Sequence, residues 1–258
     1  MVYSLSGAGP LTNATQNHQS TAHAAAIAGQ IRMQLAGDSF VNRLLPSPGL
    51  IERIRGRPRG VSLAEAQYVL RRSSYFDHAL TRFLTSPDPG QVVLIVGDYD
   101  TRPWRFADAL SDRTIFAITA VEMAERVRVS PEGPLSVALR SAGFSPATRS
   151  LFLWEGGAMF SSRAEVKATL SAIRSLCTPR SLLVLDGRSM ATRPAQLSHL
   201  GQPVRFAIHP EDLSGLLRRL DFEVIDVADA DELRRRFPPE GRSETATGFV
   251  MTARLAGL

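Results

Sequence analysis

Acidic side chains in this sequence follow the ends of apolar runs that are typical of buried strands. The run Gln91–Val96 leads into a turn at Gly97 and then into a helix start near Thr101–Arg105. The carboxylates that stand at such strand ends are Asp98, Asp100, Glu155 and Asp186. Because the carboxyl ends of parallel strands meet at one edge of a sheet, these groups are expected to share a crevice where a ligand binds.

Carboxylates and a histidine in such a crevice can transfer protons or fix a polar ligand. The predicted catalytic residues are Glu155, Asp98, Asp100 and His209. His209 comes just before a helix start at Pro210 and is a candidate general base, the alternative being a loop histidine. Thr101 stands where it can cap the following helix. Asp100, Thr101 and Arg102 can equally form a structural cap and an ion pair.

Aromatic, apolar and charged residues beside the same strand ends are predicted to line a substrate pocket. They are Tyr75, Tyr99, Trp154, Met159, Phe160, Asp186 and Arg188. For Met159 and Phe160 the alternative is a place in the hydrophobic core. The predicted partner is a small-molecule substrate bound at the carboxyl edge of the sheet.

Several classes of site and partner are excluded by the residue inventory. The five histidines show no ligand pair at i, i+4 spacing and Cys177 is the one cysteine, so no metal site is predicted. There is no G-x-S-x-G nucleophile motif. The formal charge is +5, but the arginines are spread over the chain, so nucleic-acid binding is not expected. Because no apolar run reaches the roughly 18 to 20 residues of a membrane span and the polar start lacks a signal peptide, we expect a cytoplasmic protein without membrane contact.

Three predicted regions must position these residues. They are a flexible tail at 1–20, a helical cap or lid at 21–90 and a Rossmann-like domain at 91–258. In the last region apolar runs alternate with amphipathic ones, which predicts a parallel sheet with helices on both faces. The predicted strands are 91–96, 114–118, 127–129, 150–154, 181–186, 222–227 and 248–253, with the last two as an antiparallel edge hairpin. The predicted helices are 132–142, 163–177, 210–220 and 229–237.

The cap is predicted to contain two helices. The alanine-rich stretch 21–36 forms the first. The second starts at Ser62, which forms a capping box with Glu65, and ends near Leu84. Between the helices, residues 44–60 are rich in proline and arginine, either as a solvated loop or as a lid whose guanidinium groups pair with an anionic substrate.

Five segments of the sequence match, in order, the motifs of one known family. Residues 20–22 match its first-helix opening, 72–77 are similar to R-T-R-F-F-D-D, and 210–213 match P-E-x-L. Residues 92–106, VVLIVGDYDTRPWRF, are similar to V-V-x-L-G-A-G-L-D-T-R-x-x-R-L, and 151–160, LFLWEGGAMF, to W-E-G-x-x-M-Y. Together these segments resemble the leucine carboxyl methyltransferase-like family of S-adenosylmethionine-dependent O-methyltransferases.

The resemblance implies an α/β, Rossmann-like class I methyltransferase fold: a mostly parallel seven-stranded sheet with an antiparallel edge strand and an N-terminal helical cap over the substrate pocket. It also implies S-adenosylmethionine as the cofactor. Arg72 matches the arginine that holds the cofactor's carboxylate, Gly97 the first glycine of the cofactor loop, and Glu155 the acid after the fourth strand. The implied cofactor-binding residues are Arg72, Gly97, Asp98, Thr101, Glu155 and Gly156.

The sequence departs from the family at the cofactor contacts. The cofactor loop, 97–102, is one residue shorter and lacks the second glycine. The second strand has Ala117 and no carboxylate where the family's V-F-E-V-D holds the ribose. This loss is expected to cost about 2 to 4 kcal/mol, or about 30- to 1000-fold in affinity. The acid of V-P-V-D-L falls on 127–131, which has none, and Phe160 replaces the tyrosine of M-Y.

Two functional hypotheses follow. In the first, the chain is a divergent methyltransferase-fold enzyme of small-molecule biosynthesis that has lost normal S-adenosylmethionine use. It then catalyses a non-methylating step such as a cyclisation or isomerisation, by positioning and by hydrogen bonds to developing charge. In the second, it is an active O-methyltransferase on a carboxyl or hydroxyl group, with the cofactor in an altered pose. A non-catalytic partner that stabilises another enzyme is a third interpretation, and the sequence leaves the substrate and the oligomeric state open.

Overall fold

The computed structural model describes residues 63–95, 100–118, 126–130, 133–189, 204–238 and 248–257. The predicted tail at 1–20, helix at 21–36, basic connection at 44–60 and Ser62 cap lie outside these residues. The same holds for Gly97, Asp98 and Tyr99 of the turn after the first strand. The division of the chain into tail, cap and domain therefore stays a prediction.

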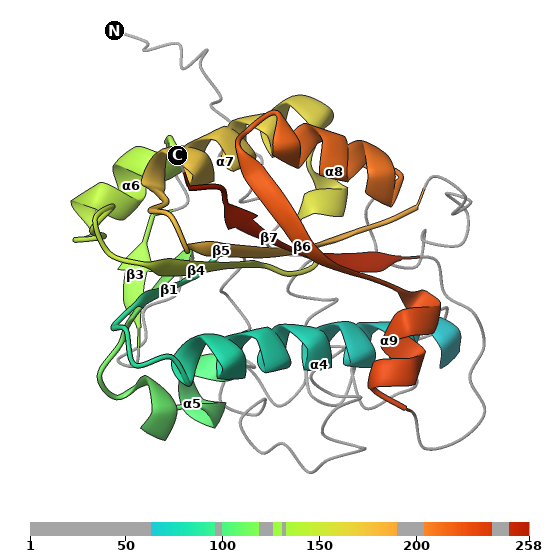
Figure 1. Ribbon diagram of the computed structural model, residues 1–258, viewed down its shortest axis with the longest axis horizontal. Coiled ribbons are helices and arrows are strands. Elements are labelled where there is room, and N and C mark those ends of the chain that lie inside the picture. Colours follow the sequence, from blue (N-terminus) through green and yellow to red (C-terminus); the bar gives the residue numbers. More distant parts are fainter. Residues whose placement is uncertain are drawn as a thin grey trace, which may run out of the picture.

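Seven strands form one mixed sheet in the order β3-β2-β1-β4-β5-β7-β6 (Figure 1). The strands are β1 (Gln91–Leu94), β2 (Thr114–Ile118), β3 (Val127–Val129), β4 (Ser150–Trp154), β5 (Leu182–Gly187), β6 (Phe222–Asp229) and β7 (Phe249–Leu255). β1 to β5 pair in parallel, whereas β7 is antiparallel to both of its neighbours, β5 and β6. The predicted fold, a mostly parallel seven-stranded sheet of the Rossmann-like class I methyltransferase type, is confirmed. β6 and β7 pair antiparallel at the edge of the sheet, as predicted, with β6 outermost and β7 between β6 and β5.

Helices cover both faces of this sheet. They are α4 (Leu63–Leu84), α5 (Arg102–Arg105), α6 (Leu135–Ser141), α7 (Arg163–Leu176), α8 (Pro210–Arg218) and α9 (Ala230–Arg236). Figure 1 shows α6, α7 and α8 on one face, and α4, α5 and α9 on the other. Every residue of β1 and β4 is buried, as expected for central strands covered on both sides. Within the described ranges, no helix has the length and the apolar content that crossing a membrane requires.

Each face of the sheet has its own hydrophobic core. Leu139 of α6, Leu170 of α7 and Leu217 of α8 are fully buried in the first core. Phe76 of α4 and Leu233 of α9 are fully buried in the second. Burying such a side chain stabilises a fold by about 1.5 to 3 kcal/mol. Packing on both faces therefore fixes the positions of the strand ends, where the candidate site is built.

Side-chain and backbone caps explain where the helices begin. The Ser162 hydroxyl accepts a hydrogen bond from Glu165 N at 3.3 Å, and Ser162 N donates to the Glu165 carboxylate at 2.5 Å, which completes a capping box for α7. The Asp229 carboxylate accepts from Glu232 N at 2.7 Å at the start of α9. α6 begins later than the predicted residue 132, because Pro134 takes the N-cap position with an extended backbone.

A β-bulge in β6 decides which face of the sheet its side chains take. The register shifts between Val224, which pairs with Ala253, and Asp226, which pairs with Thr252. The Tyr75 hydroxyl on α4 donates to Asp226 Oδ2 at 2.7 Å and lies 2.8 Å from Thr252 Oγ1. The bulge thus turns a polar pair toward α4, where it meets a buried tyrosine.

Candidate functional site

Glu155, directly after β4, is the centre of a group of charged side chains at the carboxyl edge of the sheet. Its Oε1 accepts hydrogen bonds from Arg72 Nε at 3.2 Å and from Ser73 Oγ at 2.5 Å. Its Oε2 accepts one from Arg102 Nη2 at 2.6 Å. Both carboxylate oxygens are thus engaged, by guanidinium groups that come from α4 and from α5.

Asp186, at the end of β5, joins this group from the neighbouring strand. Its carboxylate accepts hydrogen bonds from Arg72 Nη1 at 3.1 Å and from the backbone N–H of Gly156 at 2.6 Å. The Asp186 side chain is only 1% exposed. The carboxylates that follow β4 and β5 therefore lie together, and Arg72 bridges them.

Arg102 is a second centre of charge pairing, at the start of α5. Besides Glu155, its guanidinium donates to Asp77 Oδ1 at 2.8 Å and to Asp100 Oδ2 at 2.7 Å. Arg105 adds two hydrogen bonds to the Asp77 carboxylate, at 2.6 and 3.0 Å. We call the connected set the carboxyl-edge network. Its members are Arg72, Ser73, Asp77, Asp100, Arg102, Arg105, Glu155 and Asp186.

The carboxyl-edge network leaves its two central carboxyl groups with pKa values shifted in opposite directions. Burial alone would raise the pKa of Glu155, but Arg102, Arg72 and the Ser73 hydroxyl outweigh it and hold this pKa at about 2. Burial raises the pKa of Asp186, and Arg72 together with the Gly156 N–H opposes that rise only in part. Near neutral pH Glu155 is therefore a fixed negative charge rather than a proton donor.

The acid stability of the fold should depend on Glu155. A carboxyl whose folded pKa lies below its ordinary value of 4.5 stabilises the fold above that value, and this contribution is lost as the pH falls to about 2. We expect the free energy of unfolding, measured with urea at several pH values between 4.5 and about 2, to fall as the pH is lowered. This fall should be smaller in Glu155→Gln than in the wild type. Asp186, with its raised pKa, acts in the opposite direction in both proteins. If the free energy of unfolding changed equally with pH in both proteins, the pKa of Glu155 would not be lowered by its partners.

The structure decides between two alternatives at the start of α5. Thr101 makes no side-chain cap hydrogen bond, so the expectation that it caps the helix is wrong. Its hydroxyl instead accepts a hydrogen bond from Arg105 Nε at 2.8 Å. The Asp100 carboxylate accepts from Arg102 N at 2.9 Å and also pairs with the guanidinium of the same residue. Asp100 therefore serves as a local anchor and ion-pair partner, and a catalytic role for it stays a prediction.

Gly156 brings the backbone close to Arg72. It has φ +70, and an added Cβ would lie 3.2 Å from Arg72 Nη2. While Arg72 Nε and Nη1 are bonded to Glu155 and Asp186, its Nη2 donates to no other described residue. This nitrogen is the part of the guanidinium that remains for a ligand carboxylate.

The predicted pocket residues occupy three kinds of place. Met159 and Phe160 are at most 3% exposed, as their core alternative expects, and Trp154 is also 3% exposed. Tyr75 is also buried and its hydroxyl contacts β6 and β7. Arg188 is 1% exposed and its guanidinium lies 4.5 Å from the centroid of the Tyr68 ring. Their contact with a substrate stays a prediction.

His209 lies at the carboxyl edge of the sheet, where it is the N-cap residue of α8. Ile208 N donates to the Arg188 carbonyl at 2.9 Å, which joins the segment before α8 to the end of β5. The His209 side chain is exposed and makes no cap hydrogen bond. Its position is compatible with the predicted general base, whose role remains a prediction.

The sequence prediction did not include Ser73, Asp77 and Arg105 as site residues. The sequence did contain a pattern that could have indicated them. Ser73 and Asp77 of α4 and Arg105 of α5 are polar residues close to large apolar side chains such as Phe76. A charged residue so close to a core is expected to have a partner. The sequence alone does not say that the partner of Asp77 comes from α5.

The described residues fit one part of S-adenosylmethionine and not another. Arg72 Nη2 can receive the carboxylate of the methionine part. At the end of β2, where the ribose hydroxyls need an acceptor, Ala117 and Ile118 are apolar and at most 1% exposed. Among the residues that the structure describes, no cluster of three His, Cys, Asp or Glu side chains is placed to bind a metal ion.

Comparisons with known proteins agree on the fold. No protein-family model matches the chain, and no curated protein matches it. A presumed methyltransferase from Thermobifida fusca aligns with a TM-score of 0.58 and 14% identity, over 84% of this chain and 94% of that one. A DUF574 family protein from Streptomyces avermitilis aligns with a TM-score of 0.58 and 12% identity, over 90% of this chain and 97% of that one.

At these identities the similarity shows the fold alone, which is that of class I methyltransferases. Magnesium protoporphyrin IX methyltransferase from Synechocystis, solved with bound S-adenosylhomocysteine, is more distant, with a TM-score of 0.46 and 12% identity over 81% of this chain and 95% of that one. The narrower resemblance to the leucine carboxyl methyltransferase-like family stays a prediction.

Proposed function

We propose that this protein is a small-molecule enzyme of the methyltransferase fold that does not use S-adenosylmethionine in the normal way. It would catalyse a non-methylating step, such as a cyclisation or an isomerisation. The observation that carries the proposal is the closure of the carboxyl-edge network. Glu155 and Arg72, which the family resemblance assigns to the cofactor, hold each other and Asp186 instead.

The second support for the proposal is the apolar end of β2. A ribose bound there would lose the charge-assisted hydrogen bonds that an acidic side chain supplies. Ala117 is fully buried in the core beneath α4 and its methyl group offers no acceptor, so among the described residues of β2 none replaces the acidic side chain. Hydrogen bonds to charged groups contribute about 1.5 to 3 kcal/mol each, so the expected loss of cofactor affinity is large.

The chemistry proposed for this site is electrostatic rather than acid–base. Glu155 stays ionised because its pKa is held at about 2, and its two arginine partners are fixed by several hydrogen bonds. Fixed charges that need no reorganisation can stabilise charge that develops on a substrate during a rearrangement. In this proposal Glu155 and Arg72 orient and polarise the substrate, and His209 serves in proton transfer.

One observation favours a second candidate, an active S-adenosylmethionine-dependent O-methyltransferase. Arg72 Nη2 has no hydrogen bond to any other described residue and lies beside the backbone of Gly156. A cofactor carboxylate bound to this nitrogen would leave the bonds from Arg72 to Glu155 and Asp186 intact. Methyl transfer would then depend on proximity of the substrate oxygen rather than on a strong base.

Calorimetric titration with S-adenosylmethionine and with S-adenosylhomocysteine separates the two candidates. We expect no binding of either ligand below about 1 mM, because the ribose lacks its acceptor at β2. Micromolar binding of either ligand would contradict the first candidate and support the second. A variant Arg72→Gln would then lose the binding if the carboxylate sits at Nη2, whereas Arg82→Gln, at an exposed position of α4, should bind like the wild type.

A further inference from the structure

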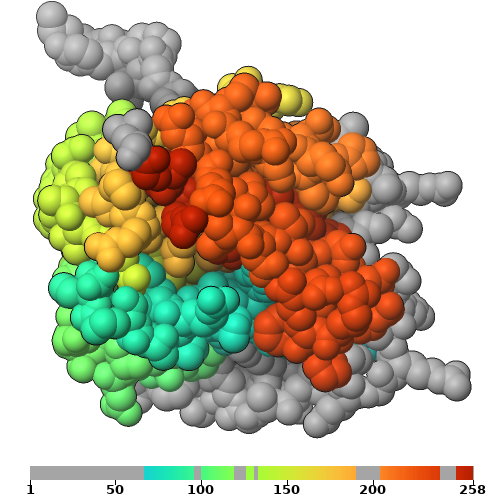
Figure 2. Space-filling view, in the orientation of Figure 1, coloured from blue at the N-terminus to red at the C-terminus, as the bar shows by residue number. Residues whose placement is uncertain are grey.

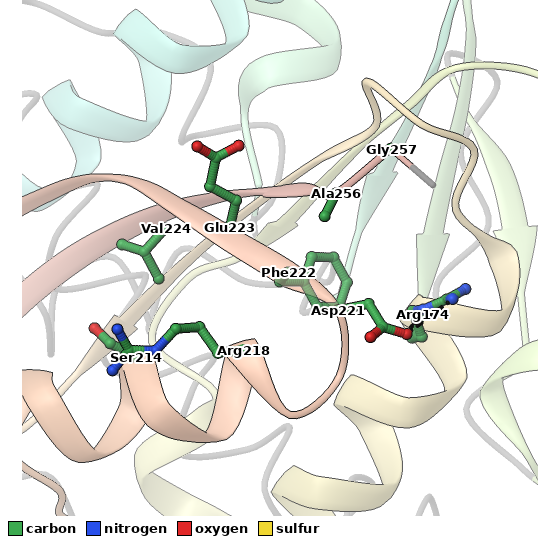
Figure 3. A pocket seen from close by; sticks show the side chains of 9 residues that line it. All are labelled: Arg174, Ser214, Arg218, Asp221, Phe222, Glu223, Val224, Ala256 and Gly257. Atoms are coloured by element: carbon green, nitrogen blue, oxygen red, sulfur yellow. Dashed lines mark hydrogen bonds and ion pairs between the residues drawn. The ribbon is translucent and has the colours of Figure 1, made fainter.

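A cavity opens at the amino-terminal edge of the sheet, opposite the carboxyl-edge network. It has a volume of about 600 Å³ and lies between α8, the end of α7, the start of β6 and the segment after β7 (Figure 3). Pockets that bind small molecules are commonly about 300 to 1,000 Å³ in volume. The size of this cavity is therefore suited to one small ligand.

Among the described residues, one arginine of the cavity lacks a charged partner. The Asp221 carboxylate pairs with Arg174 Nη2 at 3.0 Å, and the Glu223 carboxylate pairs with Arg254 Nη2 at 2.5 Å. Both carboxylates of the cavity are thus compensated. The guanidinium of Arg218 makes no hydrogen bond or ion pair with any other residue in the described part of the chain. When Arg254, which pairs with Glu223 from outside the cavity, is counted, the described charges around the cavity sum to one positive charge, which favours a single anionic group.

The wall of the cavity beside this charge is apolar. Phe222 and Val224 alternate with Glu223 along β6, so they face α8 while the carboxylate points to the other side of the strand, as Figure 3 shows. Ala256 closes the end where β7 has finished. A ligand whose anionic end pairs with Arg218 would place its remaining atoms on hydrocarbon.

Backbone hydrogen bonds fix the turn that forms the floor of the cavity. Asp221 has φ +60, a left-handed conformation that aspartate tolerates better than most residues. Its N–H donates to the Arg218 carbonyl at 3.1 Å, and its carbonyl accepts from Ala256 N at 2.8 Å. The cavity is therefore held open by the fold itself and does not need a ligand in order to form.

We propose that this cavity is a binding site for a small organic carboxylate. The carboxylate pairs with Arg218, whose planar guanidinium presents two parallel N–H donors to a carboxylate, and the apolar part of the ligand packs on Val224 and Ala256. The site shares no residue with the carboxyl-edge network, so it does not depend on the function proposed for that edge.

Benzoate, benzamide and inorganic phosphate are suitable probes for this site. Benzoate has the carboxylate and the apolar part, benzamide has the shape without the charge, and phosphate has the charge without the apolar part. Binding is followed by chemical-shift changes of the backbone amides of residues 221–224 during titration of the full chain. We expect benzoate to bind and to shift these amides, and both other probes to bind at least about tenfold more weakly.

Two neighbouring arginines supply a matched pair of variants. Arg218→Gln removes the proposed partner, and Arg219→Gln removes the same charge from an exposed residue that does not line the cavity. We expect benzoate affinity to fall about tenfold or more in the first variant and to stay unchanged in the second. Equal affinity in both variants, equal affinity for benzamide or phosphate, or no benzoate binding up to about 20 mM would each overturn the proposal.

Discussion

Replacing Glu155 by glutamine is expected to lower the free energy of unfolding at neutral pH by about 3 kcal/mol. The change leaves Arg72 and Arg102, whose side chains are only 6% and 5% exposed, without their shared negative partner. Breaking a buried ion pair by removing one member costs about 3 to 5 kcal/mol. The lower end applies here, because each arginine keeps another carboxylate, Asp186 or Asp77.

The pKa of Glu155 leads to the same magnitude by a separate route. A fall from 4.5 to about 2 corresponds to a difference of about 3 kcal/mol between the charged and neutral forms, at 1.36 kcal/mol for each pH unit. Both estimates describe the loss of one negative charge from the same set of donors. Both lead to an expected loss of about 3 kcal/mol for Glu155→Gln.

Urea denaturation monitored by circular dichroism measures this loss, and Glu223→Gln is its control. Glu223 also pairs with an arginine, Arg254, but the two side chains are 54% and 47% exposed. Exposed pairs of this kind contribute at most about 1 kcal/mol. If Glu155→Gln were no more destabilising than Glu223→Gln, the carboxyl-edge network would not be a closed, buried cluster.

The sheet followed from local patterns in the sequence because its strands are short apolar runs with turn signals at each end. β2, β3 and β4 lie where the apolar runs 114–118, 127–129 and 150–154 predicted them. The place of β7 was harder to predict, because strand order depends on long-range pairing. The hairpin of β6 and β7 fixes their adjacency, but it does not say which of the two strands pairs with β5.

The candidate site was predictable in its location and less so in its internal pairing. Glu155 and Asp186 could be assigned to one edge because parallel strands end together. The roles of Arg72 and Arg102 depend on the distances from α4 and from α5 to the end of β4, which no local pattern encodes. Sequence reasoning therefore treated Glu155 as an available acid, whereas the structure shows it bonded to three donors.

Replacing Gly156 by alanine is expected to destabilise the fold by about 3 kcal/mol and to displace Arg72. The backbone at Gly156 has φ +70, a conformation that costs an alanine about 1 to 2 kcal/mol. The new Cβ would also stand 3.2 Å from Arg72 Nη2 and 3.6 Å from its Cζ. Overpacking of this kind adds about 1 to 3 kcal/mol when the neighbour cannot move freely.

Arg72 has little freedom to move because its other two nitrogens are bonded to Glu155 and Asp186. Gly156 is also fixed, since its own N–H donates to the Asp186 carboxylate at 2.6 Å. Any shift that relieves the contact must therefore stretch at least one of these hydrogen bonds. Gly156→Ala should therefore weaken the hydrogen bonds among Arg72, Glu155 and Asp186 at the centre of the carboxyl-edge network.

Two other glycines separate the backbone strain from the contact with Arg72. Gly133 and Gly143 have φ +78 and +93, and a Cβ added to either would meet nothing within 4 Å. Alanine at these positions should cost only the backbone term of about 1 to 2 kcal/mol. The excess destabilisation of Gly156→Ala over these controls, measured by urea denaturation, reports the crowding of Arg72. An excess near zero would mean that the Arg72 side chain moves aside without a loss of stability. The arginine would then be held more loosely than its hydrogen bonds to Glu155 and Asp186 imply.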